Sequence, residues 1–428
     1  MNKKKYVNRN YLTTTRIIAL GFLITVIVGT ILLSLPIASA NGTWTDLLTA
    51  AFTSTTSVCV TGLVVVDTFS YWSLFGKGVI LILIQIGGLG IVSIITLFML
   101  LFRMKITLKS TMLLQDAFNL NSKQGLLKFT IKVIKGTFLI EGIGAFIYSF
   151  YYCREYGLLK GIWFSVFHAV SAFCNAGLDI MGADSLIPYH SNLLMMLNTS
   201  FLIIMGGIGF IVWWDTVEAF RRIRTKKCSI RSAWNGVHLQ TKIAIFMTLL
   251  LLIGGTVVIY FLERSNPDTL GNLSEKDRIL NAFFQSVTLR TAGFAAVPQA
   301  ALRPVTAFFG ALLMMIGGSP VGTAGGMKTV TIAVIFFTFA AMIRNHEDTE
   351  VFKRNIPVSV VKKAVAIVFL SMSTIFIMTI LLMATNDVNL LDALFEVASA
   401  VCTVGLSRNL TPVLNTAGQI IIMICMYI

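Results

Sequence analysis

Charged residues are scarce in this chain. Asp, Glu, Lys and Arg make up 12% of its 428 residues, while 56% are hydrophobic. A soluble domain carries about 25% charged residues, so this composition excludes a soluble fold. Many apolar runs reach about 20 residues, long enough to cross a hydrocarbon core about 30 Å thick. The sequence therefore predicts a multi-pass, all-α integral membrane protein in contact with lipid.

The sequence also lacks the usual motifs of a chemical site. Its four histidines show no metal-ligand spacing, and its six cysteines form no CxxC pair, so we interpret the cysteines as free thiols. No glycine-rich phosphate loop is visible. A polytopic membrane enzyme, such as a lipid-modifying transferase, would need His, Asp and Glu clusters that are not seen here. We predict no enzymatic activity, no catalytic residue and no catalytic or covalent cofactor.

The net charge of +15 comes from bases that are unevenly placed along the chain. Most of the 34 Lys and Arg lie in four segments, which alternate with poorly basic ones: residues 3–16, 103–135, 221–242 and 344–363. This alternation is the positive-inside pattern of a membrane protein and does not indicate nucleic-acid binding. It predicts a protein of the cytoplasmic membrane whose N-terminus is cytoplasmic.

The N-terminal segment looks at first like a cleavable signal peptide. A basic stretch at residues 3–5 precedes an apolar run and a small-residue stretch at residues 38–40. The apolar run covers 17–35, longer than the usual core of about 7–15 residues. We therefore interpret it as the first membrane helix.

The apolar segments fall into four units, each with a spanning helix, a short helix, a loop and a returning helix. The unit boundaries are 1–102, 103–220, 221–343 and 344–428. Spanning helices are expected at 16–35, 131–152, 241–262 and 365–384, and short helices at 46–56, 161–171, 276–288 and 390–401. Returning helices are expected at 78–102, 193–214, a broken 304–343, and from about 417 onward.

The units align on one glycine in each loop. These glycines are Gly62, Gly177, Gly293 and Gly405, at intervals of 115, 116 and 112 residues. A phenylalanine stands ten residues before each of them: Phe52, Phe167, Phe283 and Phe395. Such a period predicts an internal repeat. Since each unit crosses the membrane twice, all four share one orientation. They give eight spanning helices and four re-entrant pore helices with pseudo-fourfold symmetry about a single pore.

The four loops predict a selectivity filter made of backbone carbonyls. The aligned strands are Val60-Thr61-Gly62-Leu63, Asn175-Ala176-Gly177-Leu178, Thr291-Ala292-Gly293-Phe294 and Thr403-Val404-Gly405-Leu406. The last begins with Thr-Val-Gly, as potassium-channel filters do. Glycine permits the special backbone that points carbonyls at an ion. The short helices would direct their negative C-terminal ends at the pore and so favour cations.

These features resemble the Trk/Ktr/HKT family of potassium transporters, most closely the Ktr-type membrane subunit. The most specific marks are residues 288–294, residues 175–179 and the broken third returning helix. The resemblance implies potassium uptake, often sodium-dependent, with K+ held at the filter carbonyls. It also implies a homodimer and a cytosolic RCK-type regulatory ring that binds ATP or ADP. The nucleotide would belong to that partner.

The interruption of the third returning helix is rich in glycine and contains a proline, which a regular helix does not tolerate. It comprises Gly317, Gly318, Ser319, Pro320, Val321, Gly322, Thr323, Ala324, Gly325 and Gly326. A lipid-facing kink is one interpretation. We favour the family's intramembrane gating loop, lying under the filter. Lys328 is either a latch of this gate or a lysine that snorkels to the interface.

Two other charged residues lie beside the filter. Arg290 stands three residues before Gly293, and we expect it to turn behind the filter and pair with a carboxylate. Asp179 either adds negative potential at the outer mouth or caps a turn.

The sequence departs from the expected pattern at two places. None of the strands has the second glycine of a channel filter, since those positions hold Val64, Asp179, Ala295 and Ser407. We therefore expect weaker discrimination against sodium. The last helix, from 417 to 428, is too short to span, so the chain is expected to be truncated. An ion-coupled carrier of organic solutes is the alternative function, although small-residue loops suit a bare ion better.

Overall fold

The computed structural model describes residues 14–90, 93–94, 126–346, 348–352 and 354–428. This part of the chain is helical, apart from one small antiparallel hairpin of β1 (Glu350–Val351) and β2 (Arg354–Asn355). The predicted all-α architecture is confirmed. The basic segments at 3–13 and 103–125, and residues 95–102 of the first returning helix, lie outside the described residues.

The outgoing helix of each unit is long and apolar. These helices are α1 (Thr14–Ser34), α7 (Leu126–Tyr156), α12 (Leu239–Glu263) and α16 (Val358–Thr385). Within the described ranges, they are the four helices whose length and hydropathy suffice to cross a membrane. The helices contain the four predicted spanning segments, except that α1 ends one residue before the predicted end at residue 35.

A short helix follows each outgoing helix, as predicted. These pore helices are α2 (Leu47–Val58), α8 (Leu158–Cys174), α13 (Glu275–Thr288) and α17 (Leu390–Val401). Three of them begin at a polar cap, because the side chains of Asp46, Ser274 and Asn389 accept hydrogen bonds from backbone N–H groups of the first turn. α8 begins instead at Gly157, whose φ is 80°.

The returning helices are shorter or broken. They are α4 (Leu74–Leu89), the pair α9 (Leu193–Gly207) and α10 (Phe210–Lys226), the pair α14 (Pro304–Met315) and α15 (Thr329–Ile343), and α18 (Thr416–Tyr427). The break in the third unit is confirmed. The single crossing predicted at 193–214 is wrong, since α9 and α10 meet at an angle of 97°. If this bent pair counts as one span, the described residues hold up to five spanning elements.

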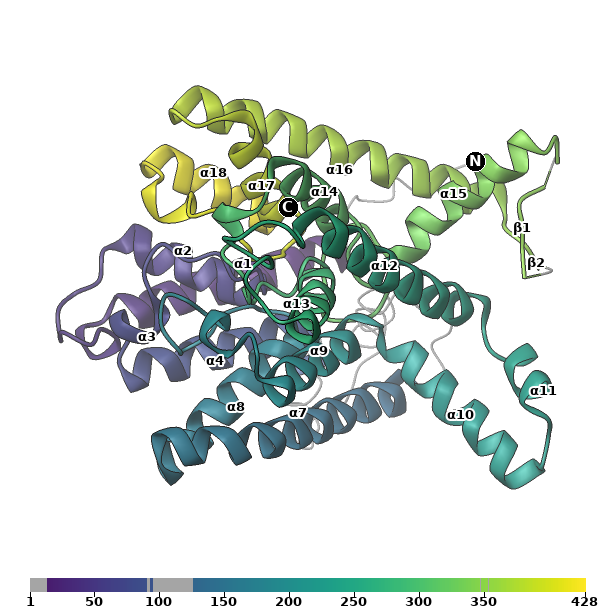
Figure 1. The fold of residues 1–428 in the computed structure, drawn as a ribbon, viewed down its shortest axis with the longest axis horizontal. Helices are drawn as coiled ribbons and strands as arrows, with labels where there is room; N and C mark the ends of the chain where they lie inside the picture. Colours follow the sequence, from purple (N-terminus) through teal and green to yellow (C-terminus); the bar gives the residue numbers. More distant parts are fainter. Residues whose placement is uncertain (1–13, 91–92, 95–125, 347, 353) are drawn as a thin grey trace, which may run out of the picture.

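Short elements join these helices at the two ends of the bundle. They are α3 (Thr68–Tyr71), α11 (Ile230–Asn235) and the 3-10 turns η1 (Pro36–Ala38), η2 (Ile187–Tyr189), η3 (Gln299–Ala301) and η4 (Thr411–Val413). The basic segment at 221–242 is mostly helical, since it comprises the end of α10, all of α11 and the start of α12. Figure 1 shows α11 and the hairpin at one end of the molecule and α3 at the other.

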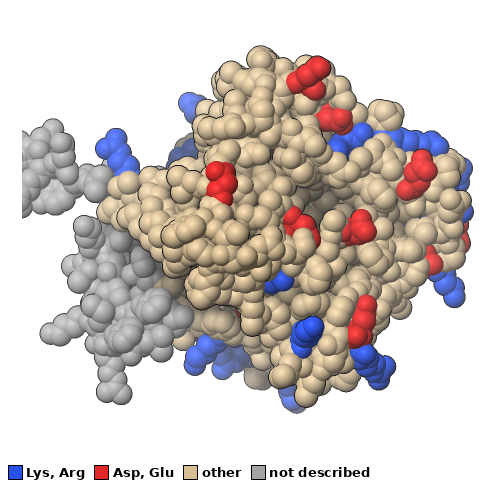
Figure 2. Space-filling model, turned by 90° about the vertical axis from the view of Figure 1, so that its left-hand side faces the viewer, with Lys and Arg blue, Asp and Glu red and all other residues tan. Residues whose placement is uncertain are grey.

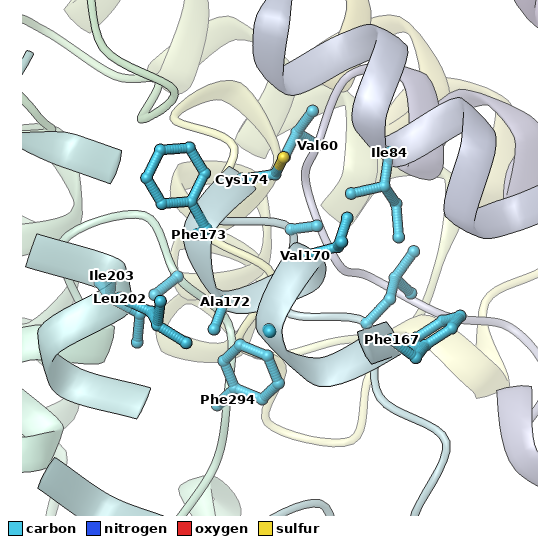
Figure 3. Packing of buried hydrophobic residues seen from close by; sticks show 14 of the residues in the cluster. Val60, Ile84, Phe167, Val170, Ala172, Phe173, Cys174, Leu202, Ile203 and Phe294 are labelled. Atoms are coloured by element: carbon cyan, nitrogen blue, oxygen red, sulfur yellow. The ribbon is translucent and has the colours of Figure 1, made fainter. Parts of the chain in front are cut away.

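Two large hydrophobic clusters form the core. The first joins mainly the first two units, and the second mainly the last two. The pore helices lie inside these clusters: the aligned Phe52, Phe167 and Phe395 have no exposed surface. In the third unit the aligned Phe283 is half-buried, and its neighbour Phe284 is the fully buried one. Figure 3 shows Phe173 and Cys174, at the end of α8, packed among Val60, Leu202, Ile203 and Phe294. The end of α8 is therefore held by close packing against neighbouring units.

Candidate functional site

Each pore helix leads into the same unusual backbone. A residue with left-handed φ comes first: 55° at Val60, 61° at Asn175, 63° at Thr291 and 50° at Thr403. Two positions later stands a glycine with positive φ: 99° at Gly62, 64° at Gly177, 84° at Gly293 and 92° at Gly405. Left-handed backbone is strained for β-branched residues such as valine and threonine. Its recurrence at four aligned positions marks one shared loop design.

The four glycines meet in a ring. A Cβ built on Gly177 would lie 2.6 Å from the Ala292 carbonyl oxygen, and one on Gly293 would lie 2.7 Å from that of Val404. Gly62 and Gly405 face the carbonyl oxygens of Ala176 and Thr61 even more closely. Each glycine thus faces the carbonyl that precedes the glycine of the next unit, in the order one to four and back to one. The sixteen predicted filter residues are brought together, and side chains at the ring are sterically excluded.

Hydroxyl groups of the pore helices brace these loops. Thr56 Oγ1 accepts from the Gly62 N–H at 2.9 Å, and Ser399 Oγ accepts from the Gly405 N–H at 3.0 Å. In the middle units the hydroxyl donates to the residue after the glycine: Ser171 to the Leu178 carbonyl at 2.5 Å, and Thr288 to the Phe294 carbonyl at 2.7 Å. The first and last loops therefore use one bracing pattern and the middle two another.

The outer residue of each filter strand packs away from the ring. Leu63, Leu178, Phe294 and Leu406 are at most 1% exposed and belong to the hydrophobic clusters. Polar atoms on the strands remain unpaired: Thr61 Oγ1, Asn175 Nδ2 and Thr291 Oγ1 have no hydrogen-bond partner among the described residues. The apolar side chains anchor the strands in the two hydrophobic clusters.

The broken stretch of the third unit lies against these strands. The Thr323 hydroxyl is 3.0 Å from the Phe173 carbonyl oxygen and 3.0 Å from Asn175 Oδ1. Gly325 faces the side chain of Thr403 so closely that no Cβ would fit. A cavity of about 520 Å3 borders both the predicted filter strands and the broken stretch. Its lining includes Val60, Thr403 and residues 322–328. The predicted gate residues Gly317 to Gly326 are therefore inside the protein, and the lipid-facing kink is excluded.

The two basic residues near this stretch bond to its backbone. Arg290 Nη2 donates to the Gly317 carbonyl at 3.3 Å, and in the described ranges Arg290 forms no ion pair. The carboxylate partner expected for Arg290 is thus wrong, because a buried carbonyl takes that place. Lys328 Nζ donates to the Ala324 carbonyl at 2.7 Å and lines the cavity. Lys328 therefore turns into the protein and does not snorkel.

Charged groups also lie next to the loops of the second and fourth units. Arg408 Nε is 2.6 Å from Asp392 Oδ1, and Arg408 Nη1 donates to the Gln299 carbonyl at 3.0 Å. Buried Glu396 accepts from Ser407 Oγ at 3.0 Å and from Thr411 Oγ1. Asp179 accepts from the Met181 N–H at 3.3 Å, which is the turn-capping role. Figure 2 shows acidic side chains beside a hollow on one face of the molecule.

Sequence reasoning missed Glu396, Arg408 and Gly209. Glu396 and Arg408 belong to the fourth unit alone, so the repeat alignment gives no signal for them. Gly209 follows the sequence Gly206-Gly207-Ile208 and has a φ of 95°. Gly90 ends the matching sequence Gly-Gly-Leu-Gly of the first unit with a φ of 78°. This shared glycine is the signal that could have indicated a break in α9–α10.

The fold and site define a mainly helical integral membrane protein with four similar loops that meet at a ring of glycines. A family model described as TrkH, a cation transport protein, matches residues 3–428. The chain belongs to this family, as a Trk/Ktr-type membrane subunit. The family is one of cation transporters and not of enzymes.

Individual relatives agree with this assignment. The chain is 38% identical to potassium/sodium uptake protein NtpJ of Enterococcus hirae, over 98% of this chain and 91% of the relative. It is 37% identical to Ktr system potassium uptake protein B of Bacillus subtilis, over 100% and 93%. The solved structure of the potassium transporter TrkH from Vibrio parahaemolyticus is similar in fold, with a TM-score of 0.72 and 16% identity, over 99% of this chain and 84% of that one.

Proposed function

We propose that this protein mediates potassium uptake across the cytoplasmic membrane through a single pore on the axis of its four units. The ring of Gly62, Gly177, Gly293 and Gly405 carries the proposal. Backbone carbonyls arranged around an axis replace the water of a dehydrated ion without charged ligands. Nonhelical backbone at membrane depth is tolerated where it is buried in protein or lines a wet cavity. The names of the relatives, which specify potassium or sodium uptake, favour the same substrates.

The proposed filter discriminates potassium from sodium less strongly than a potassium channel does. Each strand has one glycine, so it offers fewer well-formed carbonyl sites than the two-glycine channel motif. Sodium therefore enters the proposal as a coupling or competing ion. An ion-coupled carrier of organic solutes is the weaker candidate, because the small residues of these loops offer little to bind an organic headgroup, whereas they suit a bare ion.

The proposed gate is the stretch from Gly317 to Gly326, assisted by Lys328. It lies against the filter of the second unit through Thr323, and Arg290 holds its first carbonyl. In this position it obstructs the inner side of the filter. Replacing the stretch by a short rigid linker should raise ion flux, and an unchanged flux would contradict a gate.

The proposal includes a regulator and an orientation. The basic ends of the helices, near α10 and α11, face the cytosol, in accordance with the distribution of Lys and Arg. A cytosolic RCK-type ring that binds ATP or ADP acts on a homodimer of this subunit, as the family resemblance implies. The name "Ktr system" of the relatives favours a multi-subunit assembly.

Rubidium uptake tests the function. The full chain would be expressed, with its partner, in cells that lack their own potassium uptake, and Rb+ accumulation would be measured with and without Na+. We expect saturable Rb+ uptake that excess K+ inhibits. A Gly177→Ala variant of equal membrane abundance serves as the inactive control. No Rb+ uptake by the natural chain with the partner present would overturn the proposal.

A further inference from the structure

The bend between α9 and α10 interrupts the helical hydrogen bonds of buried backbone groups. In a continuous helix, the carbonyls of residues 205, 206 and 207 would accept from the N–H groups of residues 209, 210 and 211. Gly209, with a φ of 95°, breaks this ladder. Helix ends leave such groups unsatisfied, and inside a membrane they need other partners.

Those partners come mainly from the broken stretch of the third unit. The Thr323 N–H donates to the Gly206 carbonyl at 3.1 Å, and the Ser319 N–H donates to the Gly207 carbonyl at 2.8 Å. In return, the Phe210 N–H donates to the Val321 carbonyl at 2.8 Å. The remaining carbonyl, of Met205, accepts from Trp213 Nε1 at 3.0 Å. The bent helix pair and residues 317–326 thus complete each other's backbone bonding.

We propose that the α9–α10 bend is the second half of the gate: residues 317–326 leave the pore as α9 and α10 close into a straighter helix. This inference rests on the proposed gate and adds how it opens. If residues 317–326 moved alone, two carbonyls and one N–H of the second unit would be left unpaired at membrane depth. Straightening pairs the same groups within the helix, so both movements proceed together.

Gly209 is the positioning residue of this movement. A Cβ built there would lie 2.5 Å from the Pro320 carbonyl oxygen, and its φ is one that other residues rarely adopt. Only glycine suits the bent state, whereas a straight helix accepts alanine well. Asp215 of α10 connects this movement to the start of α12. It accepts from Thr241 Oγ1 at 2.5 Å and lies 2.8 Å from His238 Nδ1. A movement of α10 would therefore be transmitted to α12 at the cytosolic end.

The test measures the bend and the flux separately. Spin labels at exposed positions 197 of α9 and 224 of α10, in the full chain without other accessible thiols, report their separation in lipid by pulsed electron resonance. A bend of 97° places these backbone positions about 27 Å apart, and a straight helix about 40 Å. Rb+ flux into vesicles is measured on the same preparations.

Three variants are compared. Gly209→Ala should shift the distance distribution toward the longer value and raise flux without the regulator by about tenfold, since left-handed backbone is disfavoured for alanine. Replacing residues 317–326 by a short linker should lengthen the distance too. The control is Gly157→Ala. Gly157 has a similarly strained φ of 80°, but a Cβ built on it meets nothing within 4 Å. This variant should change neither the label distance nor the flux.

The outcomes separate the two proposals. If the linker variant raises flux while its labels keep the short distance, the gate stands and the coupled bend is wrong. If the linker variant leaves flux unchanged, the gate itself is wrong. Should Gly209→Ala fold poorly, the linker variant alone decides the coupling through its distance distribution.

Discussion

The four loops of the proposed filter resemble one another, whereas the returning helices next to them differ from unit to unit. At the filter, all four units repeat one loop, with a left-handed residue followed by a glycine and a hydroxyl brace. Beneath it, α9–α10 and α14–α15 are broken and hydrogen-bonded to each other. An ion on the axis needs similar oxygens from every side, whereas a gate needs an element with two states. Under the proposed function, the symmetric loops coordinate the ion and the asymmetric, broken helices regulate its passage.

The largest effect is expected at the glycine ring. Alanine at Gly177 or Gly293 places a Cβ within 2.7 Å of a neighbouring carbonyl oxygen, and the same change at Gly405 brings it closer. Rb+ uptake should fall by about 100-fold in each variant, because backbone strain of 1–3 kcal/mol adds to this clash. Gly42→Ala, which has a φ of 68° and open space around it, is the matched control. If Rb+ uptake fell in the variants of one unit only, the proposal that all four units form the filter would be wrong.

A smaller effect of opposite sign is expected beneath the ring. Thr323→Val removes the hydroxyl that contacts Phe173 and Asn175, so the obstructed state loses about one hydrogen bond. Flux without the regulator should rise about fivefold, for a bond worth about 1 kcal/mol. The control is Thr256→Val, since Thr256 bonds within its own helix. A decrease in flux would argue that Thr323 supports conduction.

The hydroxyl braces should affect selectivity more than flux. Ser399→Ala leaves the Gly405 N–H unpaired in a buried site, and Thr56→Val does the same to Gly62. We expect the preference for Rb+ over Na+ to fall about fivefold in each, from an unpaired group costing about 1 kcal/mol. Competition uptake with both ions measures this ratio. Ser149→Ala, at an exposed hydroxyl, should leave it unchanged.

The smallest effect is expected at the outer mouth. Arg408→Gln breaks the partly exposed ion pair with Asp392 and should lower stability by about 1 kcal/mol, while uptake changes less than twofold. Thermal unfolding of purified protein measures the first, and Rb+ uptake the second. A loss of uptake as large as that of the glycine variants would contradict this expectation and indicate that Arg408 takes part in ion passage.

The parts of this molecule that follow from local sequence were predictable. The bounds of α17 coincide with the prediction, because Asn389 caps its start and a period of apolar residues follows. The meeting of the four loops was predictable from the glycine alignment, since only glycine fits where four backbones approach so closely. The break in the third unit was visible as a run of glycines with a proline.

The parts that depend on distant partners were not predictable. The bend at Gly209 is stabilised by residues 319–323, more than 100 positions away. The glycine indicates where a break can occur, but the size of the bend depends on those distant partners. Arg290 is bonded to a backbone carbonyl, which carries no sequence signal. The hairpin of β1 and β2 has two residues in each strand, too few for a recognisable pattern.

Locating rubidium in the protein tests the central claim most directly. Crystals grown in rubidium chloride would be measured at the rubidium absorption edge. We predict an anomalous peak on the axis of the four units, at the level of Gly62, Gly177, Gly293 and Gly405. Peaks only at the surface, with none on this axis under saturating rubidium, would contradict the account.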